Sequence, residues 1–248
     1  LIYFPLSSYK IGFLDKVFFS LFHSISAFCN AGFSTLPYGL MNKGFIHNYN
    51  FQSVLIVLIF LGGIGFPILI NLVRYVEYLI RKVFLLIIHK TNDKKNWVFT
   101  LSSKVNLITS LSILIISTII LFFEEYYRTL APHHGFGKFV SATFIAMTPR
   151  TAGFNNIDFA QLHFSSILLV ILLMWIGASP ASTGGGIKTS TFAIGILNFI
   201  NIARGKPKIE IYKRELNSIN IQIVFAIISL LFLVIGIGIF LITKFDNN

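Results

Sequence analysis

The chain has 248 residues, of which 55% are hydrophobic and only 12% are charged, and its mean hydropathy is +0.78. Soluble domains average roughly 25% charged residues, so this composition excludes an ordinary water-soluble domain and indicates a membrane protein. The net charge of +11 does not indicate nucleic-acid binding, because most basic residues gather in two segments between apolar runs. The single cysteine, Cys29, excludes an internal disulfide.

The N-terminal part of the chain contains a short helix, a glycine stretch and a long apolar run. The first residues, Leu-Ile-Tyr-Phe-Pro, include no initiator methionine, basic leader or cleavage site, so we expect a fragment of a longer protein. A mostly apolar helix is predicted at Val17–Phe28, and Asn-Ala-Gly-Phe-Ser follows from Asn30. After an outer loop comes Val54–Leu72, which has no charged residue, contains a glycine-proline break and holds about the 20 residues that cross a membrane.

Two further charge-free runs, Val105–Phe123 and Ile219–Thr243, are also long enough to span a membrane. A basic segment precedes each of them, and the positive-inside rule places such segments in the cytoplasm. The loops at 36–50, 124–135 and 155–163 are then expected to face outward. The basic residues of the two segments are Arg74, Arg81, Lys82, Lys90, Lys94, Lys95 and Lys104, followed by Arg204, Lys206, Lys208, Lys213 and Arg214.

The pattern of the first part of the chain is repeated 121 positions later, where a short helix predicted at Lys138–Thr148 runs into Thr-Ala-Gly-Phe at Thr151. The similarity extends in both directions, with an outer loop and an apolar run after each glycine stretch, as in a true repeat. We predict an all-α polytopic membrane protein with repeated helix–pore loop–helix units around a pseudo-fourfold pore. The predicted divisions are a pore unit at 1–90 that lacks most of its first helix, a pore unit at 91–203 with a broken second helix, and a linker with the next first helix at 204–248.

The two short helices cannot span the membrane, so each must enter from outside, end near mid-membrane and return. Irregular backbone at that depth is tolerated only where it is buried in protein or lines a water-filled cavity. Glycine allows successive carbonyl oxygens to point one way, and such carbonyls replace the hydration shell of a cation in potassium-channel filters. A tight turn between packed helices is the alternative, and the repetition disfavours it. The predicted filter residues are Asn30, Ala31, Gly32, Phe33, Thr151, Ala152, Gly153 and Phe154, with potassium at Gly32 and Gly153 and the two phenylalanines as scaffold that wedges the loops against helices.

A second glycine-rich segment interrupts what should be one spanning helix after Ser165. Pro180 and three successive glycines oppose a continuous helix, and a lysine inside a membrane indicates function. A phosphate-binding loop is excluded, because Ile187 separates Gly186 from Lys188 where that motif requires Gly-Lys. A packing kink is the alternative to a flexible gate below the filter. The predicted gating residues are Ala178, Ser179, Pro180, Ser182, Thr183, Gly184, Gly185, Gly186 and Lys188.

Other polar residues are weaker candidates. Arg150 would repel cations in a pore, so we expect it to turn away and pair with an acid or with scaffold carbonyls. Outer acidic residues would concentrate cations, but a solvated face is the favoured interpretation of Glu124, Glu125 and Asp158. No metal-ligand or catalytic spacing involves His23, His133 or His134.

These motifs together resemble the Trk/Ktr/HKT superfamily of potassium transporters. In that family the second repeat typically contains Asn-Ala-Gly-Phe-Ser, as at Asn30–Ser34, and the third contains Thr-Ala-Gly-Phe, as at Thr151–Phe154. The segment Gly-Ala-Ser-Pro-Ala-Ser-Thr-Gly-Gly-Gly-Ile-Lys-Thr is similar to the family's intramembrane gating loop. The resemblance covers nearly the whole chain, and it implies a multi-pass subunit of the bacterial cytoplasmic membrane that takes up K+ and is not an enzyme.

The resemblance also implies partners. Family members are homodimers in membrane lipid with a cytosolic nucleotide-binding regulatory ring, and neither nucleic acid nor an organic cofactor is expected. A rival hypothesis is a sodium-coupled or sodium-selective secondary transporter with a midplane site formed by broken helices. If its repeats were inverted, the two glycine stretches would lie on opposite faces of the membrane. An intramembrane enzyme is disfavoured, because the apolar runs contain neither paired acids nor a nucleophile with a base.

Overall fold

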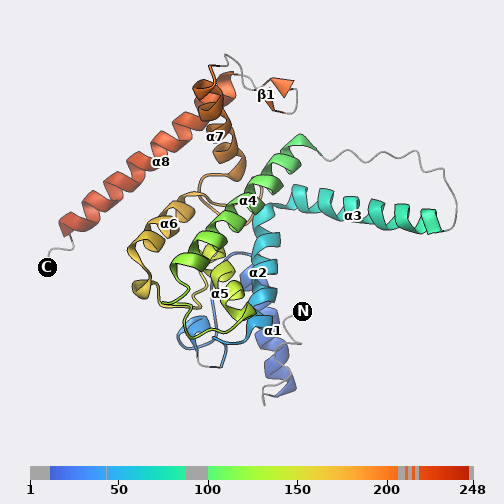
Figure 1. Cartoon of the computed structure of the whole chain (residues 1–248), viewed down its shortest axis with the longest axis vertical. Coiled ribbons are helices and arrows are strands. Elements are labelled where there is room, and N and C mark those ends of the chain that lie inside the picture. Colours follow the sequence, from blue (N-terminus) through green and yellow to red (C-terminus); the bar gives the residue numbers. More distant parts are fainter. Residues whose placement is uncertain are drawn as a thin grey trace. The chain divides into compact units, whose positions relative to one another are not determined.

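The computed structural model describes residues 12–42, 44–87, 100–205, 210–211, 214–215 and 218–245 (Figure 1). The chain divides into two compact units, Leu1–Thr189 and Ser190–Asn248. This division concerns compactness, so the repeat boundaries expected at residues 90 and 203 stay predictions. In the described residues the structure is helical apart from one pair of two-residue strands, which agrees with the predicted all-α class.

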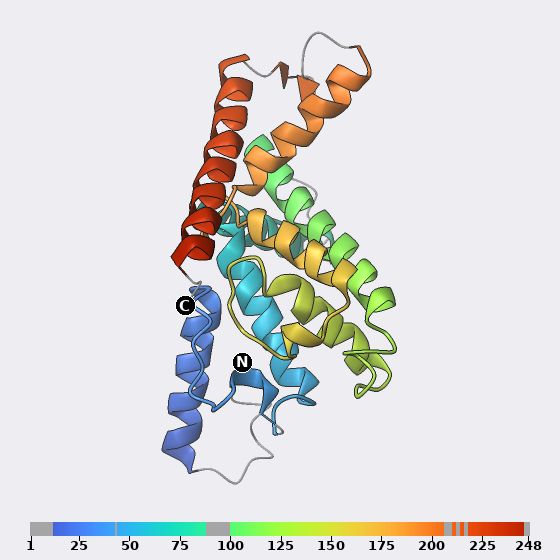
Figure 2. The same ribbon diagram turned by 90° about the vertical axis from the view of Figure 1, so that its left-hand side faces the viewer.

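The first compact unit contains the predicted pore unit 1–90 and residues 91–189 of the predicted pore unit 91–203. The helices of the first pore unit are α1 (Phe13–Phe28), the 3-10 turn η2 (Gly39–Met41), α2 (Tyr49–Ile64) and α3 (Phe66–Ile87). Those of the second are α4 (Leu101–Glu124), α5 (Phe136–Met147), η3 (Phe159–Gln161) and α6 (Phe164–Trp175). Helix α1 packs on α2, and α5 packs on both α2 and α4 (Figure 2).

The second compact unit holds most of α7 (Thr189–Ala203), strands β1 (Glu210–Ile211) and β2 (Arg214–Glu215), and α8 (Ser218–Phe245). The strands pair antiparallel, with Glu210 opposite Glu215 and Ile211 opposite Arg214. Helix α7 packs on α8 near Gly195, where the side chains of Val224 and Ile228 come close to the glycine backbone. A Cβ on Gly195 would lie 3.7 Å and 3.9 Å from these side chains, which are ordinary contacts, so this approach does not require glycine.

The predicted spanning helices agree with the structure in two of three cases. Val105–Phe123 lies inside α4 and Ile219–Thr243 lies inside α8, and both helices are long and apolar enough to cross a membrane. Val54–Leu72 is not one straight helix, because α2 and α3 meet at Gly65 with a bend of 111°. Gly65 has φ +91°, which only glycine adopts readily, and a Cβ there would lie 2.5 Å from the carbonyl oxygen of Pro180. The sequence showed the break but not its size.

Both short helices are present, with small differences in their bounds. The first begins four residues earlier than expected, at Phe13, and the second is α5. One apolar core joins the two pore units, since Phe51, Leu55 and Ile59 of α2 pack with Phe144 of α5 and with Phe154. The second glycine stretch is therefore fixed to the helices of the first pore unit.

Gly62 on α2 allows the C-terminal end of α1 to approach. A Cβ on Gly62 would lie 1.9 Å from the carbonyl oxygen of Phe28, whereas a Cβ on Gly63 would have only ordinary contacts, the nearest at 3.7 Å from Asn30 Nδ2. We therefore expect Gly62→Ala to destabilise the protein by about 1–3 kcal/mol through overpacking, and Gly63→Ala to have little effect. The apparent Tm in detergent measures both, and equal values would contradict the assigned contact.

Candidate functional site

The two glycine stretches have the same unusual backbone. Asn30 (φ +51°) and Gly32 (φ +73°) are left-handed, and so are Thr151 (φ +66°) and Gly153 (φ +77°). A β-branched residue such as threonine rarely adopts positive φ, and backbone strain of this kind gathers at functional sites. The first and third residues thus share one conformation in both copies, and the predicted repeat extends to backbone geometry.

Each stretch folds back on the helix that precedes it. The N–H of Ala31 donates to Ser26 O at 2.9 Å, and the N–H of Gly153 donates to Thr148 O at 3.3 Å. The Ser26 hydroxyl donates to the carbonyl of Phe33 at 2.8 Å, and the Thr148 hydroxyl donates to the carbonyl of Phe154. These two hydrogen bonds fix the end of each stretch to the helix that precedes it.

The two phenylalanines differ in their surroundings. Phe154 is 1% exposed and lies in the core, so it wedges its loop against the helices as expected. Phe33 is 70% exposed among the described residues, so its role as a wedge stays a prediction. After Phe33, His23 fixes the chain, because its Nε2 lies 3.0 Å from the hydroxyl of Ser34 and its Nδ1 lies 2.9 Å from Phe19 O.

The backbones of the two stretches touch. A Cβ on Gly32 would lie 2.7 Å from both Ala152 O and the Cα of Gly153, and a Cβ on Gly153 would lie 3.2 Å from the Cα of Gly32. Only glycine fits at this contact.

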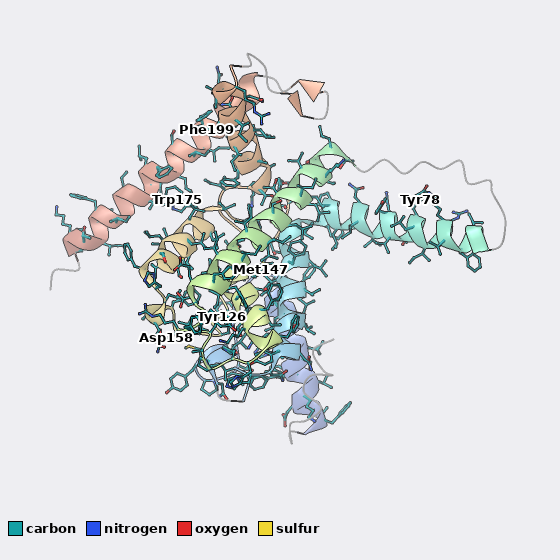
Figure 3. All side chains as sticks on the ribbon, viewed as in Figure 1. Tyr78, Tyr126, Met147, Asp158, Trp175 and Phe199 are labelled. Atoms are coloured by element: carbon teal, nitrogen blue, oxygen red, sulfur yellow. The ribbon has the colours of Figure 1, made fainter. Side chains whose placement is uncertain are left out.

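The C-terminal ends of two helices lie next to these stretches. Helix α1 ends at Phe28 and α5 ends at Met147. Figure 3 shows Met147 among α2, α4 and α5, in the interior of the first compact unit. Helix C-termini carry partial negative charge from unpaired carbonyls. The helix ends therefore favour a cation at the glycine stretches.

The segment between α6 and α7 forms a closed loop. The N–H of Gly177 donates to Ile187 O at 3.1 Å, and the N–H of Ile187 donates to Trp175 O at 3.0 Å. The backbone of Trp175–Gly177 therefore pairs with that of Ile187. Close to this pairing, a Cβ on Gly177 would lie 1.7 Å from Gly185 O. The expected flexible segment is thus a folded loop with paired ends. We call residues 178–188 the intramembrane loop.

The tip of the intramembrane loop contacts the glycine stretches. The side-chain amide of Asn30 donates to the hydroxyl oxygen of Thr183 at 2.9 Å, and that hydroxyl donates to Phe28 O at 3.2 Å. A Cβ on Gly184 would lie 2.5 Å from Thr151 Oγ1. Lys188 folds over its own loop, with Nζ 2.8 Å from Gly184 O. The predicted filter residues and the predicted gating residues therefore lie in contact with each other.

Helix α4 holds the base of the intramembrane loop through residues that the sequence analysis did not single out. Buried Thr189 donates its hydroxyl proton to Asn106 Oδ1 at 2.7 Å, and Ser179 Oγ lies 3.1 Å from Thr189 Oγ1. Asn106 and Ser110 are polar residues four positions apart in an apolar run, so they share a helix face. This spacing is the feature of the sequence that could have predicted a polar contact on this face of α4.

Arg150 turns away from the glycine stretches, as predicted. It is 7% exposed, and its terminal nitrogens donate to Ser110 O at 3.3 Å and to Gly177 O at 3.2 Å. Of the two expected kinds of partner, these are scaffold carbonyls. Because Arg150 immediately precedes Thr151 and Gly177 begins the loop region, Arg150 joins a glycine stretch to the base of the intramembrane loop.

Of the acidic residues near the outer loops, Glu124 and Asp158 are exposed, as expected for a solvated face, whereas Glu125 is not. Glu125 is fully buried and accepts hydrogen bonds at 2.8 Å from both the N–H of His163 and the hydroxyl of Thr129. Burial raises the pKa of Glu125, but the hydrogen bonds together hold it below its ordinary value. Glu124 accepts from the Ser165 hydroxyl at 2.9 Å, and Asp158, labelled in Figure 3, caps η3 through the N–H of Ala160. Glu125 is thus a structural anchor.

Comparison with known proteins agrees with this geometry. The sequence matches the family described as "TrkH: Cation transport protein" over residues 1–247. It is 34% identical over 237 residues to Ktr system potassium uptake protein B of Bacillus subtilis (strain 168), covering 94% of this chain and 48% of that protein. It is 31% identical over 209 residues to Potassium/sodium uptake protein NtpJ of Enterococcus hirae. This match covers 84% of this chain and 42% of that protein.

The fold is also similar to a solved structure. The crystal structure of the potassium transporter TrkH from Vibrio parahaemolyticus matches with a TM-score of 0.70 at 18% identity, covering 98% of this chain and 48% of that chain. At this identity the similarity concerns the fold. The chain spans about half the length of the relatives that it matches.

His133 joins the outer parts of the two pore units and should make stability depend on pH. It is buried, with Nδ1 3.1 Å from Tyr49 Oη and 3.4 Å from Ser141 Oγ. Burial, and then the nearby charges of His47, His134 and Lys138, lower its pKa from 6.5 to about 4. Between these values the unfolded chain binds the proton more readily, so stability should fall as the pH drops from about 6.5 to about 4.

His133→Asn keeps a hydrogen-bond acceptor but does not titrate, so the pH dependence of the apparent Tm in that window should flatten. His134→Asn, at the exposed neighbour, should retain the dependence of the parent protein. Equal pH profiles for the two variants would contradict the assignment.

Proposed function

The chain belongs to the TrkH family of cation transport proteins, and from this premise we propose that it contributes two pore loops to a potassium uptake pathway. In this pathway Asn30–Phe33 and Thr151–Phe154 form adjacent parts of a carbonyl-lined filter for K+. The intramembrane loop obstructs the pathway below the filter. The observation that carries the proposal is the contact of two glycine stretches with the same left-handed positions.

The chemistry of the site suits a dehydrated monovalent cation. Carbonyl oxygens are neutral, so they replace the hydration shell without binding the ion so tightly that it cannot leave. The ends of α1 and α5 add partial negative charge at the same place. The buried charge of Arg150 is directed to Ser110 and Gly177 rather than to the stretches, and this avoids repulsion of the ion.

Similarity to named uptake proteins supports K+ as the substrate. One relative is named a potassium uptake protein and another a potassium/sodium uptake protein, so discrimination between the two ions is part of the test. The sodium-coupled alternative is not favoured, because the more similar of the two named relatives is a potassium uptake protein.

The wider setting of the protein follows from the same proposal. We place the subunit in the bacterial cytoplasmic membrane as a homodimer with a cytosolic nucleotide-binding regulatory partner. Helix α3 carries exposed Arg74, Arg81 and Lys82 on the side expected to be cytoplasmic. Three further basic residues of that segment, Lys90, Lys94 and Lys95, lie outside the described residues. Basic residues at this surface suit anionic lipid headgroups.

A substitution at Gly32 tests the filter. In the full-length protein we expect Gly32→Ala to reduce K+ uptake at least tenfold or to abolish discrimination against Na+, because the new methyl group would displace Ala152 and Gly153. Gly205→Ala is the control, since Gly205 has a similar φ of +67° but open space around it. Uptake by cells that lack their own K+ transporters provides the measurement. Parental kinetics and selectivity in a well-expressed Gly32→Ala variant would refute the filter assignment.

A substitution at Thr183 tests the gate. Thr183→Val removes the hydroxyl that binds Asn30 and Phe28 at nearly constant volume, so the intramembrane loop should leave the pathway more easily and K+ flux should rise several-fold. Thr183→Ser keeps the hydroxyl and should behave like the parent. Deletion of residues 182–186 should raise flux further. Indistinguishable fluxes for the valine and serine variants, measured in liposomes, would contradict the tether.

A further inference from the structure

A small, partly open cavity is lined by residues in and next to the glycine stretches. Side chains from α2, α4 and α5 and from the intramembrane loop form its wall, and most of them are apolar, such as Ile59 and Met147. Three polar residues also line it, and they come from different parts of the chain: Asn30, Ser110 and Arg150. The cavity thus lies where the first stretch, α4 and the residue before the second stretch meet.

Each of the three polar residues has a buried atom without a hydrogen-bond partner. These atoms are Asn30 Oδ1, Ser110 Oγ and Arg150 Nε. Arg150 is 7% exposed and Ser110 is 3% exposed. Buried polar groups in folded proteins almost always have partners, and here three of them line one cavity. The lining is therefore suited to a polar ligand.

The orientation of Asn30 is fixed by its neighbour. The single hydroxyl proton of Thr183 goes to Phe28 O, so the Thr183 oxygen must accept from Asn30. The NH2 group of Asn30 therefore faces Thr183, and its carbonyl oxygen is the free group. The cavity presents an N–H donor from Arg150, a pure acceptor from Asn30 and a hydroxyl from Ser110 that serves either way.

The charges and the size of the cavity select the ligand. A cation would be repelled by the guanidinium of Arg150, and an anion would face the oxygen of Asn30. A neutral molecule that both donates and accepts satisfies all three atoms, and the space among them is that of a single water molecule.

We infer that this cavity binds one ordered water molecule, which accepts from Arg150 Nε, donates to Asn30 Oδ1 and shares a hydrogen bond with Ser110 Oγ. The water connects Asn30 of the first stretch, and Arg150 just before the second stretch, to Ser110 of α4. It also keeps Asn30 in the orientation that holds Thr183 of the intramembrane loop. The water site itself follows from the cavity, whereas its effect on ion selectivity rests on the proposed function.

The first test is a structure of the full-length protein at a resolution that shows ordered waters, with crystals soaked separately in bromide and in thallium(I). We expect a peak within hydrogen-bond distance of the three atoms and no anomalous signal from either ion at that peak. A bromide signal would show an anion site and a thallium signal a cation site. Either signal, or an empty cavity, would overturn the inference.

The second test compares two serine substitutions on α4. Ser110→Val fills the water position with methyl groups and leaves Arg150 Nε and Asn30 Oδ1 unsatisfied. Ser117→Val is the matched control, because Ser117 is equally buried but its hydroxyl bonds only to Ile113 O and Leu114 O of its own helix. We expect Ser110→Val to lose the water peak and to lower the apparent Tm by several degrees more than Ser117→Val does. Equal Tm values would count against the water.

Ion transport separates this inference from the proposed function. If both hold, Ser110→Val should also weaken discrimination of K+ from Na+, and Ser117→Val should not. Loss of the water and of stability with unchanged ion selectivity would contradict the effect of the water on selectivity while the water site stands, and the filter itself is tested separately by Gly32→Ala. If Ser110→Val does not fold, the same comparison is made with Ser110→Ala, which removes only the hydroxyl. The electron-density map of the parent protein then shows whether the water is present.

Discussion

The close contact between the backbones of Gly32 and Gly153 is the constraint on which the rest of the first compact unit depends. Two backbone segments approach this closely only where the residues in contact have no Cβ. Both glycines also have a left-handed backbone. A second close approach lies at Gly62, where the end of α1 meets α2. Phe154 in the shared core holds the contact from one side.

Polar groups buried near this contact are held by specific partners from distant parts of the chain. Such groups are costly in an apolar interior unless they are hydrogen-bonded. Arg150 binds carbonyls on α4 and at Gly177, while Thr189 binds Asn106. These bonds attach the intramembrane loop at its base, and Asn30 attaches it at its tip through Thr183. The intramembrane loop thus has a defined position next to the glycine stretches.

Much of the fold and of the candidate site was predictable from the sequence. Charge-free apolar runs located α4 and α8, because a membrane requires a minimum helix length. The repeated Ala-Gly-Phe located both glycine stretches, because a backbone that needs left-handed residues and close approach accepts few residue types. The pairing of Arg150 with scaffold carbonyls was predictable as well, because a positive charge facing the proposed filter would repel a cation. The roles of the filter and loop residues stay predictions.

By itself, the sequence determined the elements that obey local rules: helix length, helix breaks and the residues that tolerate unusual backbone. Only the tertiary structure decided the 111° bend at Gly65, the burial of Glu125 and the bond between Asn106 and Thr189. Each of these depends on a neighbour from elsewhere in the chain, such as Pro180 at the bend or His163 at Glu125. Composition and spacing specify what a residue can do, but packing decides which distant group it meets.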